Sequence, residues 1–136
     1  MSSRNIHRLE RVDGEISVQR NERKIRKMRK GYGDEYRTKQ ILVQQFGENN
    51  VIKVAIGSFG ADFLVVVEGR IEKVVEVKGT RKKVWHPSQR EKEQLRRILT
   101  FAQNHKCNAE VWLWVLNGGK KELHVRDVRE FVVGGD

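Results

Sequence analysis

Apolar residues recur along this chain first with the spacing of a helix and then with that of strands. Between Asp34 and Phe46 they form one stripe that ends before Gly47, which predicts a helix with Asp34 as its N-cap. Residues 51–56 are rich in β-branched side chains, and residues 63–67 are apolar at every position. A strand that is apolar on both faces is expected at the centre of a sheet, covered from either side.

The second half of the chain repeats this change of period. Residues 71–78 alternate as a strand does, and Ser88 with Glu91 matches the Ser-x-x-Glu capping box at the start of an amphipathic helix. Further strands are predicted at 111–116 and 122–125, on either side of a Gly-Gly turn. The order helix, three strands, helix, two strands predicts an α/β fold with a mixed central β-sheet flanked by helices.

The first part of the chain has a different character. Asp13-Gly14 between short mixed segments predicts a hairpin turn, and residues 21–30 are basic with a helical spacing of apolar positions. We therefore expect residues 1–29 to be a basic N-terminal extension and residues 30–136 to form the folded domain.

Charge adds the first indication of a partner. The chain has 28 Lys and Arg against 18 Asp and Glu, a net charge of +10. Residues 1–30 hold ten of the basic and four of the acidic residues, so +6 of the charge lies there. A polyanion such as nucleic acid is the natural partner of this surface. A surface that only keeps the protein soluble explains the charge equally well.

Cysteine count and hydropathy exclude several classes. A single cysteine, Cys107, excludes an internal disulfide framework and builds no zinc site by itself. No apolar run approaches the 18 residues of a membrane-spanning helix, and the basic N-terminal stretch lacks the apolar run of a secretory leader. We expect an intracellular, cytoplasmic protein without a membrane partner.

Charged residues next to the two central strands carry the candidate chemistry. Alternation places Glu76 and Lys78 on one face of strand 71–78, and Asp62 opens the preceding strand. With a three-residue turn at 68–70, Asp62 falls opposite Glu76; a two-residue turn brings them together only with a β-bulge. Two adjacent carboxylates suit Mg²⁺ or Mn²⁺, and a lysine beside them can hold a phosphate or orient a water. Alternatively, these charges belong to an edge strand and face solvent.

A longer pattern surrounds these residues. Lys-Gly-Tyr-Gly-Asp-Glu-Tyr-Arg at 30–37, Gly-Ser at 57–58, Asp62 and Val-Val-Glu-Val-Lys at 74–78 follow one another in order. Over residues 30–116 the chain resembles the archaeal Holliday junction resolvases, which belong to the restriction-endonuclease-like (PD-(D/E)xK) nucleases. These are small dimeric enzymes that cut four-way DNA junctions with Mg²⁺. The resemblance implies a restriction-endonuclease-like fold, a DNA partner and a homodimer, and it fits an archaeon or an archaeal virus as the source.

The resemblance also implies roles for individual residues. It assigns catalysis to Glu35, Ser58, Asp62, Glu76 and Lys78, with metal binding by Asp62, Glu76 and Glu35. From the residues alone, Glu35 is equally an acidic group at a helix N-terminus, and Ser58 a turn residue between glycines. The sequence departs from the family at Ala61, where a proline is usual, and in the added residues 1–29.

Two basic segments are candidate DNA contacts. The contacts predicted are Arg23, Lys24, Arg26, Lys27, Arg29, Lys30, Arg81, Lys82, Lys83 and Trp85. Alternatively, Trp85 anchors its loop to the domain. Trp112 and Trp114 share a strand face, which predicts packing or a dimer interface, and the run 131–133 is a candidate dimer surface.

Together these features predict a Mg²⁺-dependent endonuclease for branched DNA. The alternatives are an endonuclease with another DNA target and a non-catalytic DNA-binding protein.

Overall fold

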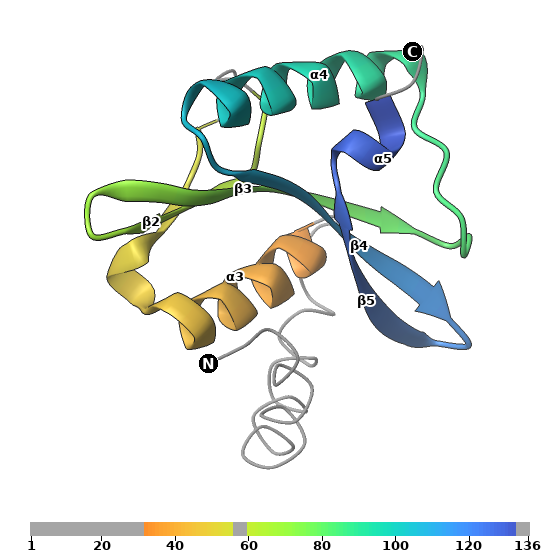
Figure 1. Ribbon diagram of the computed structural model, residues 1–136. Helices are drawn as coiled ribbons and strands as arrows, with labels where there is room; N and C mark the ends of the chain where they lie inside the picture. Colours follow the sequence, from red (N-terminus) through yellow and green to blue (C-terminus); the bar gives the residue numbers. More distant parts are fainter. Residues whose placement is uncertain (1–31, 56–59, 133–136) are drawn as a thin grey trace.

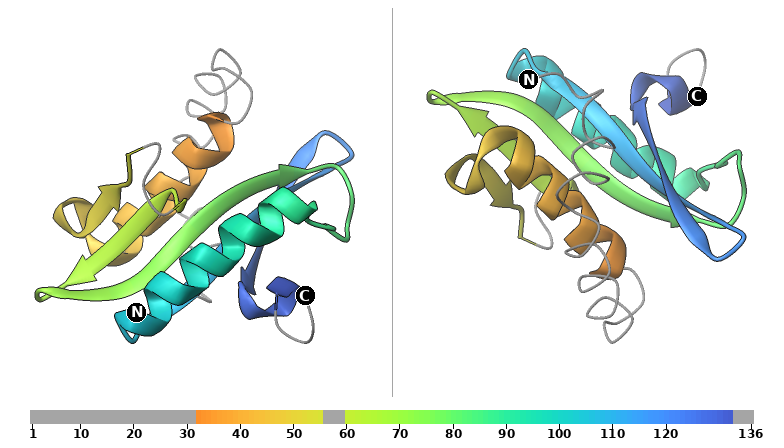
Figure 2. Two further views of the ribbon diagram at one scale, coloured as in Figure 1. Left: turned by 90° about the horizontal axis from the view of Figure 1, so that it is seen from above. Right: turned by 90° about the horizontal axis from the view of Figure 1, so that it is seen from below.

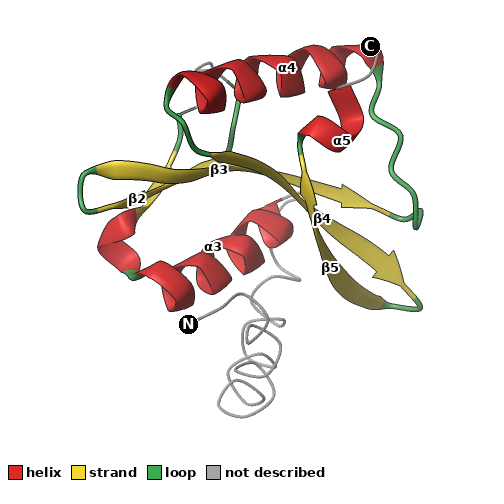
Figure 3. Ribbon diagram, in the orientation of Figure 1, coloured by secondary structure: helices red, strands yellow, loops and turns green. Residues whose placement is uncertain are grey.

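The described residues form three layers, with one β-sheet between helices. The computed structural model describes residues 32–55 and 60–132. Helix α3 (Tyr32–Phe46) covers one face of the sheet, and α4 (Gln89–Asn104) with the short α5 (Arg129–Val132) covers the other (Figures 1 and 3). A 3₁₀ turn, η2 (Glu48–Asn50), follows α3. The predicted α/β class, a mixed sheet flanked by helices, is confirmed.

Five strands make up the sheet, in the order in which they occur in the chain. They are β1 (Val51–Lys53), β2 (Phe63–Val67), β3 (Arg70–Thr80), β4 (Asn108–Asn117) and β5 (Lys120–Asp127). Only β3 and β4 run parallel to each other, because α4 returns the chain between them; the other neighbours are antiparallel. Two views from above and below show the helices on opposite sides of the long β3–β4 pair (Figure 2).

Several predicted boundaries are wrong. The first predicted strand ends at Lys53, and β2 is the second strand of the sheet, while β3 occupies the centre. Helix α3 already includes Tyr32, so Asp34 lies in its first turn and is not its N-cap. The apolar sequence of β2 indicates a buried strand. It does not specify which place that strand takes in the sheet.

Two hydrophobic clusters hold the layers together. Beneath α4 the buried members are Ala61, Val74, Leu95, Ile98, Ala102, Ala109, Val111, Leu113, Val115, Val128 and Val132. Beneath α3 they are Ile41, Leu42, Phe63, Val65, Val75, Val77, Trp112 and Trp114. Both tryptophans of β4 are therefore core residues, which confirms the packing interpretation. Strand β4 contributes to both clusters, as expected of a strand covered on both faces.

The start of α4 is fixed by the predicted capping box. The Ser88 hydroxyl accepts a hydrogen bond from the backbone N–H of Glu91, and the Glu91 carboxylate accepts one from the backbone N–H of Ser88. Such a reciprocal cap satisfies two N–H groups that the helix itself leaves without partners. An ion pair between Glu91 and Lys78 places this end of α4 next to the C-terminal half of β3.

The hairpin between β2 and β3 has a two-residue turn, so the three-residue turn is wrong. Glu68 and Gly69 both have positive φ, 52° and 76°, and Val67 pairs directly with Arg70. The register then shifts, because Val66 pairs with Ile71 but Val65 pairs with Lys73. Glu72 is therefore the extra residue of a β-bulge and leaves the regular alternation of β3. Beyond it, Phe63 pairs with Val75, and Asp62 reaches the stretch of β3 that contains Glu76.

The first turn of α3 is attached to the sheet by a buried acid. Asp34 is 7% exposed and forms ion pairs with Arg37, 2.9 Å away, and with Lys121 of β5, 3.2 Å away. One turn later, the Trp114 indole N–H donates to the Thr38 hydroxyl at 2.8 Å. Gly79 of β3 lies directly beneath Asp34, where a β-carbon would come within 2.4 Å of a carboxylate oxygen.

We expect Gly79→Ala to destabilise the domain by about 1–3 kcal/mol, because the new methyl group displaces the Asp34 carboxylate from its two cations. Urea unfolding measures the loss. In an Asp34→Ala background the clash is absent, so Gly79→Ala should cost much less there, and a double-mutant cycle isolates the coupling. Equal costs in both backgrounds would show that the close approach to Asp34 is not the cause.

Some predicted features lie outside the described residues. These are the N-terminal hairpin and basic helix, Ser58, and the DNA contacts predicted at Arg23, Lys24, Arg26, Lys27, Arg29 and Lys30. Within the described part, Val132 is buried in its own chain and Phe131 packs edge-on against Trp85, so neither offers the exposed dimer surface predicted for them. None of the described helices has the length and apolar character needed to cross a membrane.

Candidate active site

Glu76 is an acidic side chain placed inside the hydrophobic core. It lies in the middle of β3, opposite Val111 of β4, and is 3% exposed. Strand alternation turns it toward the α4 face, next to core residue Val74 on the same side. A carboxylate in such surroundings is costly unless it is paired, hydrogen-bonded or protonated. The surroundings of Glu76 must therefore supply partners or a proton.

Burial, and to a smaller extent the negative charge of the neighbouring Asp62, raise the pKa of Glu76 to about 9. The positive charge of Lys78 acts in the opposite direction but is outweighed. Oxygen Oε1 of Glu76 is buried and has no hydrogen-bond partner. Without a further cation, Glu76 is thus protonated at neutral pH, and one of its oxygens is unsatisfied.

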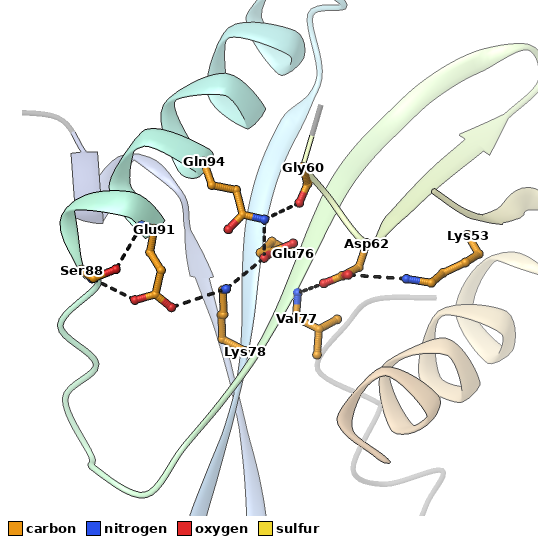
Figure 4. Close-up of polar contacts among 9 residues, drawn as sticks. All are labelled: Lys53, Gly60, Asp62, Glu76, Val77, Lys78, Ser88, Glu91 and Gln94. Atoms are coloured by element: carbon orange, nitrogen blue, oxygen red, sulfur yellow. Dashed lines mark hydrogen bonds and ion pairs between the residues drawn. The ribbon is translucent and has the colours of Figure 1, made fainter. Parts of the chain in front are cut away.

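Asp62 lies just before β2 and faces β3. Its backbone N–H donates to the carbonyl of Val75 at 3.0 Å, and its carboxylate oxygen Oδ2 accepts the backbone N–H of Val77 at 2.7 Å (Figure 4). The carboxylate thus replaces a backbone acceptor at the point where β2 no longer pairs with β3. These two bonds place Asp62 across from Glu76, which lies between Val75 and Val77.

Lys78 connects Glu76 with the capped end of α4. Its ammonium group lies 3.4 Å from Oε2 of Glu76 and 3.5 Å from Oε2 of Glu91 (Figure 4). Partial burial tends to raise the pKa of Glu91, but the backbone N–H of Ser88 and the charge of Lys78 outweigh it and hold the pKa below its usual value. The second carboxylate keeps the Lys78 ammonium at the rim of the site.

Gln94, on the next turn of α4, positions Glu76 from the opposite side. Its side-chain amide donates to Oε2 of Glu76 at 3.0 Å and to the carbonyl of Gly60 at 2.6 Å. Gly60 has a φ of 106°, and a β-carbon there would lie 2.9 Å from the Gln94 side chain. The amide thus connects the segment before Asp62 with the strand that carries Glu76.

Glu35 reaches the site only through Lys53. The Lys53 ammonium, on β1, contacts Glu35 at 2.5 Å and Asp62 at 3.5 Å. Partial burial tends to lower the pKa of Lys53, but the hydrogen bond to Glu35 and the charge of Asp62 outweigh it and raise the pKa. The family resemblance implies that Glu35, Asp62 and Glu76 bind the metal together. In the described structure a lysine separates Glu35 from Asp62.

The pair formed by Asp62 and Glu76 fits a small divalent cation. Oxygen donors from neighbouring strands are the ligands that Mg²⁺ and Mn²⁺ prefer, and Mg²⁺ commonly binds through one or two carboxylates and keeps several waters. The unpartnered oxygen of Glu76 and its raised pKa are the features that such a cation would relieve. Among the described residues, no three His, Cys, Asp or Glu side chains are grouped closely enough to hold a metal. Any cation here would depend on water or substrate for its remaining ligands.

Lys53 should compete with a divalent cation for Asp62. We expect Lys53→Met to tighten Mn²⁺ binding about two- to fivefold, because the substitution removes a positive charge from beside the partly exposed carboxylate of Asp62. Methionine keeps an apolar side chain beside the Phe63 ring. Isothermal titration calorimetry measures the change. Lys39→Met on the exposed part of α3 removes the same charge away from the site and should leave the affinity unchanged. Weaker binding to the Lys53 variant would contradict this competition.

The basic loop after β3 lies beside the same end of the sheet. Arg81, Lys82 and Lys83 are exposed, as a phosphate-binding role requires. Trp85 is half-buried, with its ring edge-on to Phe131 at a centroid distance of 5.0 Å. Anchoring of the loop, the alternative interpretation of Trp85, is therefore what the structure shows, and base stacking by this residue stays a prediction.

Lys53, Gln94 and Glu91 were not predicted as site residues. Glu91 and Gln94 are three residues apart and precede the apolar stripe of α4, so they share its inward face. Polar residues that continue a buried stripe are the signal that could have identified them. Lys53 carried no such signal, because the pairing of the three-residue β1 with β2 is not visible in the sequence.

Comparisons with known proteins find similarity among solved structures. No protein-family model matches the chain, and no curated protein matches it. Among solved structures it is similar to Hjc of Archaeoglobus fulgidus, described as a Holliday junction resolvase from an archaeal hyperthermophile. The identity is 21%, the TM-score is 0.43, and the match covers 69% of this chain and 72% of that one. A likeness of this size assigns no role to a residue, so the roles proposed below depend on the site itself.

Proposed function

We propose that this chain is a Mg²⁺-dependent endonuclease that hydrolyses phosphodiester bonds in branched DNA, four-way junctions above all. The observation that carries the proposal is the buried carboxylate of Glu76, with one unpartnered oxygen, beside Asp62 and in contact with Lys78. A solvated or purely structural charge pattern does not explain why an acid is held inside a hydrophobic core. A cation site at the reacting phosphate does.

Each residue of the site has a role in this proposal. Asp62 and Glu76 hold Mg²⁺, or Mn²⁺ in its place, and Gln94 fixes the orientation of Glu76. When bound, the cation supplies Lewis-acid polarisation of the phosphate and a water of lowered pKa. Lys78, restrained by Glu91, provides a positive charge that holds the phosphate or orients the attacking water.

Two further residues act at the edge of the proposed site. Glu35 lies on the far side of Lys53 and assists once Lys53 has turned to a DNA phosphate. Ser58, outside the described residues, positions phosphate in the role that the resemblance implies.

The DNA itself is proposed to lie across the basic segments. The exposed loop at 81–83 is next to the site, and the ten Lys and Arg residues of 1–30 extend the footprint. Resolution of a junction requires two cuts related by two-fold symmetry, so a C2 homodimer with one site in each subunit is proposed.

A cleavage assay tests the function. A synthetic four-way junction and a linear duplex containing the same arm sequence are incubated with the protein, with Mg²⁺ or with EDTA. We expect the junction to be cut in Mg²⁺ alone, and the duplex to be cut far more slowly. Equal cleavage of both substrates would favour an endonuclease with another DNA target. Junction binding without turnover in Mg²⁺ or Mn²⁺ would favour the non-catalytic DNA-binding alternative and overturn the proposal.

A further inference from the structure

The outer edge of β5 is a long strand edge without a strand partner in the described part of the chain. Strand β5 has eight residues and pairs only with β4, whereas the strand at the opposite edge, β1, has three. A long edge presents a row of backbone donors and acceptors to other chains. Val125 adds an apolar side chain that is 44% exposed.

The hydrogen bonds of β5 determine which residues face outward. The N–H of Val128 donates to the carbonyl of Ala109 on β4, so even-numbered residues direct their backbone groups inward. The N–H of Asp127 turns the other way and is taken by the Glu130 carboxylate. Alternation then directs the backbone groups of Lys121, Leu123 and Val125 toward the open edge.

This alternation restricts how two copies of β5 can pair about a two-fold axis. In an antiparallel pair, residues that exchange hydrogen bonds lie directly opposite each other, so odd-numbered residues must face odd-numbered ones. Centring the axis on Leu123 places Lys120 opposite Arg126 of the second copy. Centring it on Val125 places His124 opposite that arginine. The first arrangement opposes two basic side chains, and neither arrangement pairs an acidic side chain with a lysine or an arginine.

Centring the axis on His124 gives a different result. Leu123 then faces Val125 of the second copy, Glu122 faces Arg126, and Lys121 faces Asp127, each pair occurring twice. Each of these charged side chains also has a partner within its own chain: Lys121 pairs with Asp34, Glu122 with Asn117, Arg126 with Glu130 and Asp127 with Arg129. The contact between the two copies therefore extends existing polar networks. One apolar contact and two opposite-charge contacts coincide only in this register.

We propose that β5 pairs with β5 of a second copy of this chain, antiparallel and centred on His124, to form one continuous ten-stranded sheet. The pairing supplies a surface for the dimer that junction cleavage needs, yet it does not depend on nuclease activity. Association is measured without DNA or divalent cations, so failure of this inference and failure of the proposed function are distinguishable.

A disulfide tests the register directly. In the full-length Cys107→Ser protein, His124→Cys places two thiols opposite each other at a position without backbone hydrogen bonds, where Cα atoms are about 4.5 Å apart. We expect mild oxidation to convert most of the protein into a covalent dimer. Arg126→Cys on the same strand face is the matched control. Its two Cα atoms would be roughly 14 Å apart, too far to bridge.

A proline at position 125 tests association of the two copies without disturbing the fold of either one. Because the N–H of Val125 faces the open edge, Val125→Pro removes a donor to the second copy but none to β4, and proline is tolerated at such positions. Analytical ultracentrifugation of the wild type should show a dimer, with the dissociation constant raised at least tenfold by Val125→Pro and less by Val125→Ala. Circular dichroism verifies that the variants remain folded. A monomeric wild type, or equal crosslinking at positions 124 and 126, would overturn the proposal.

Discussion

Replacing Glu76 by glutamine is expected to reduce Mg²⁺-dependent junction cleavage by about a thousandfold or more, while junction binding in EDTA changes little. The substitution removes one of two carboxylates that hold the cation, without changing the size of the side chain. Gln94 can still hydrogen-bond to the amide oxygen that replaces Oε2. Single-turnover cleavage and fluorescence anisotropy measure the two properties on the same junction.

Matched variants make this result specific. Glu72→Gln removes a carboxylate from an exposed bulge of the same strand. This variant should cleave the junction at the wild-type rate. Asp62→Asn keeps an oxygen that can accept the N–H of Val77, so it tests the charge of Asp62 and not its hydrogen bond. Cleavage by the Glu76 or Asp62 variant at the wild-type rate would refute the site.

The same Glu76→Gln substitution is expected to stabilise the cation-free protein at pH 8 by about 2–4 kcal/mol. The pKa of Glu76 is raised from 4.5 to about 9 in the folded state. Between these values the folded chain binds a proton that the unfolded chain has released. The stabilising contribution of protonated Glu76 is complete below pH 4.5 and is lost as the pH rises toward 9. Glutamine cannot ionise, so it escapes this loss.

Urea unfolding in EDTA at pH 5 and pH 8 measures the effect. The two proteins should be almost equally stable at pH 5 and should diverge as the pH rises, with the variant ahead. Other titrating groups contribute equally to both and cancel in the difference. A difference that stays constant between pH 5 and pH 8 would contradict a protonated Glu76 in the folded protein.

Together these two outcomes describe an exchange of stability for activity. A residue whose removal strengthens the fold and abolishes turnover is retained for chemistry, as is common for buried charges at active sites. If Glu76→Gln lost both activity and stability, Glu76 would be a structural residue, and the loss of cleavage would say nothing about a cation.

The sequence predicted the elements of this site better than their arrangement. Alternation correctly placed Glu76 and Lys78 on one strand face, and the Ser-x-x-Glu motif located the start of α4, because both signals depend on neighbours in the chain. The approach of Asp62 to Glu76 depends on the length of the turn and on a β-bulge. The sequence alone did not decide between a three-residue turn and a two-residue turn followed by a bulge. The contacts of Lys53 and Gln94 depend on strand order and helix docking, which are set by packing between distant segments.

Turn chemistry explains why the hairpin was mispredicted. Glu68-Gly69 adopts two positive φ angles, a conformation for which Asn-Gly is the usual signal, and glutamate in the first position concealed it. Asp34 was mistaken for a cap for a similar reason. An acid in the first turn favours a helix N-terminus in either role, and its ion pair with Lys121 joins residues 87 positions apart.

The bulge at Glu72 has a consequence for how relatives of this chain are recognised. Because Glu72 has no partner on β2, a homologue that lacks it can keep all the cross-strand pairs and the same meeting of the two carboxylates. The spacing of fourteen positions between Asp62 and Glu76 is then one solution among several, and thirteen would serve as well. A search pattern with a rigid interval would miss such a homologue, whereas one that tolerates a single insertion or deletion after the turn would retain it.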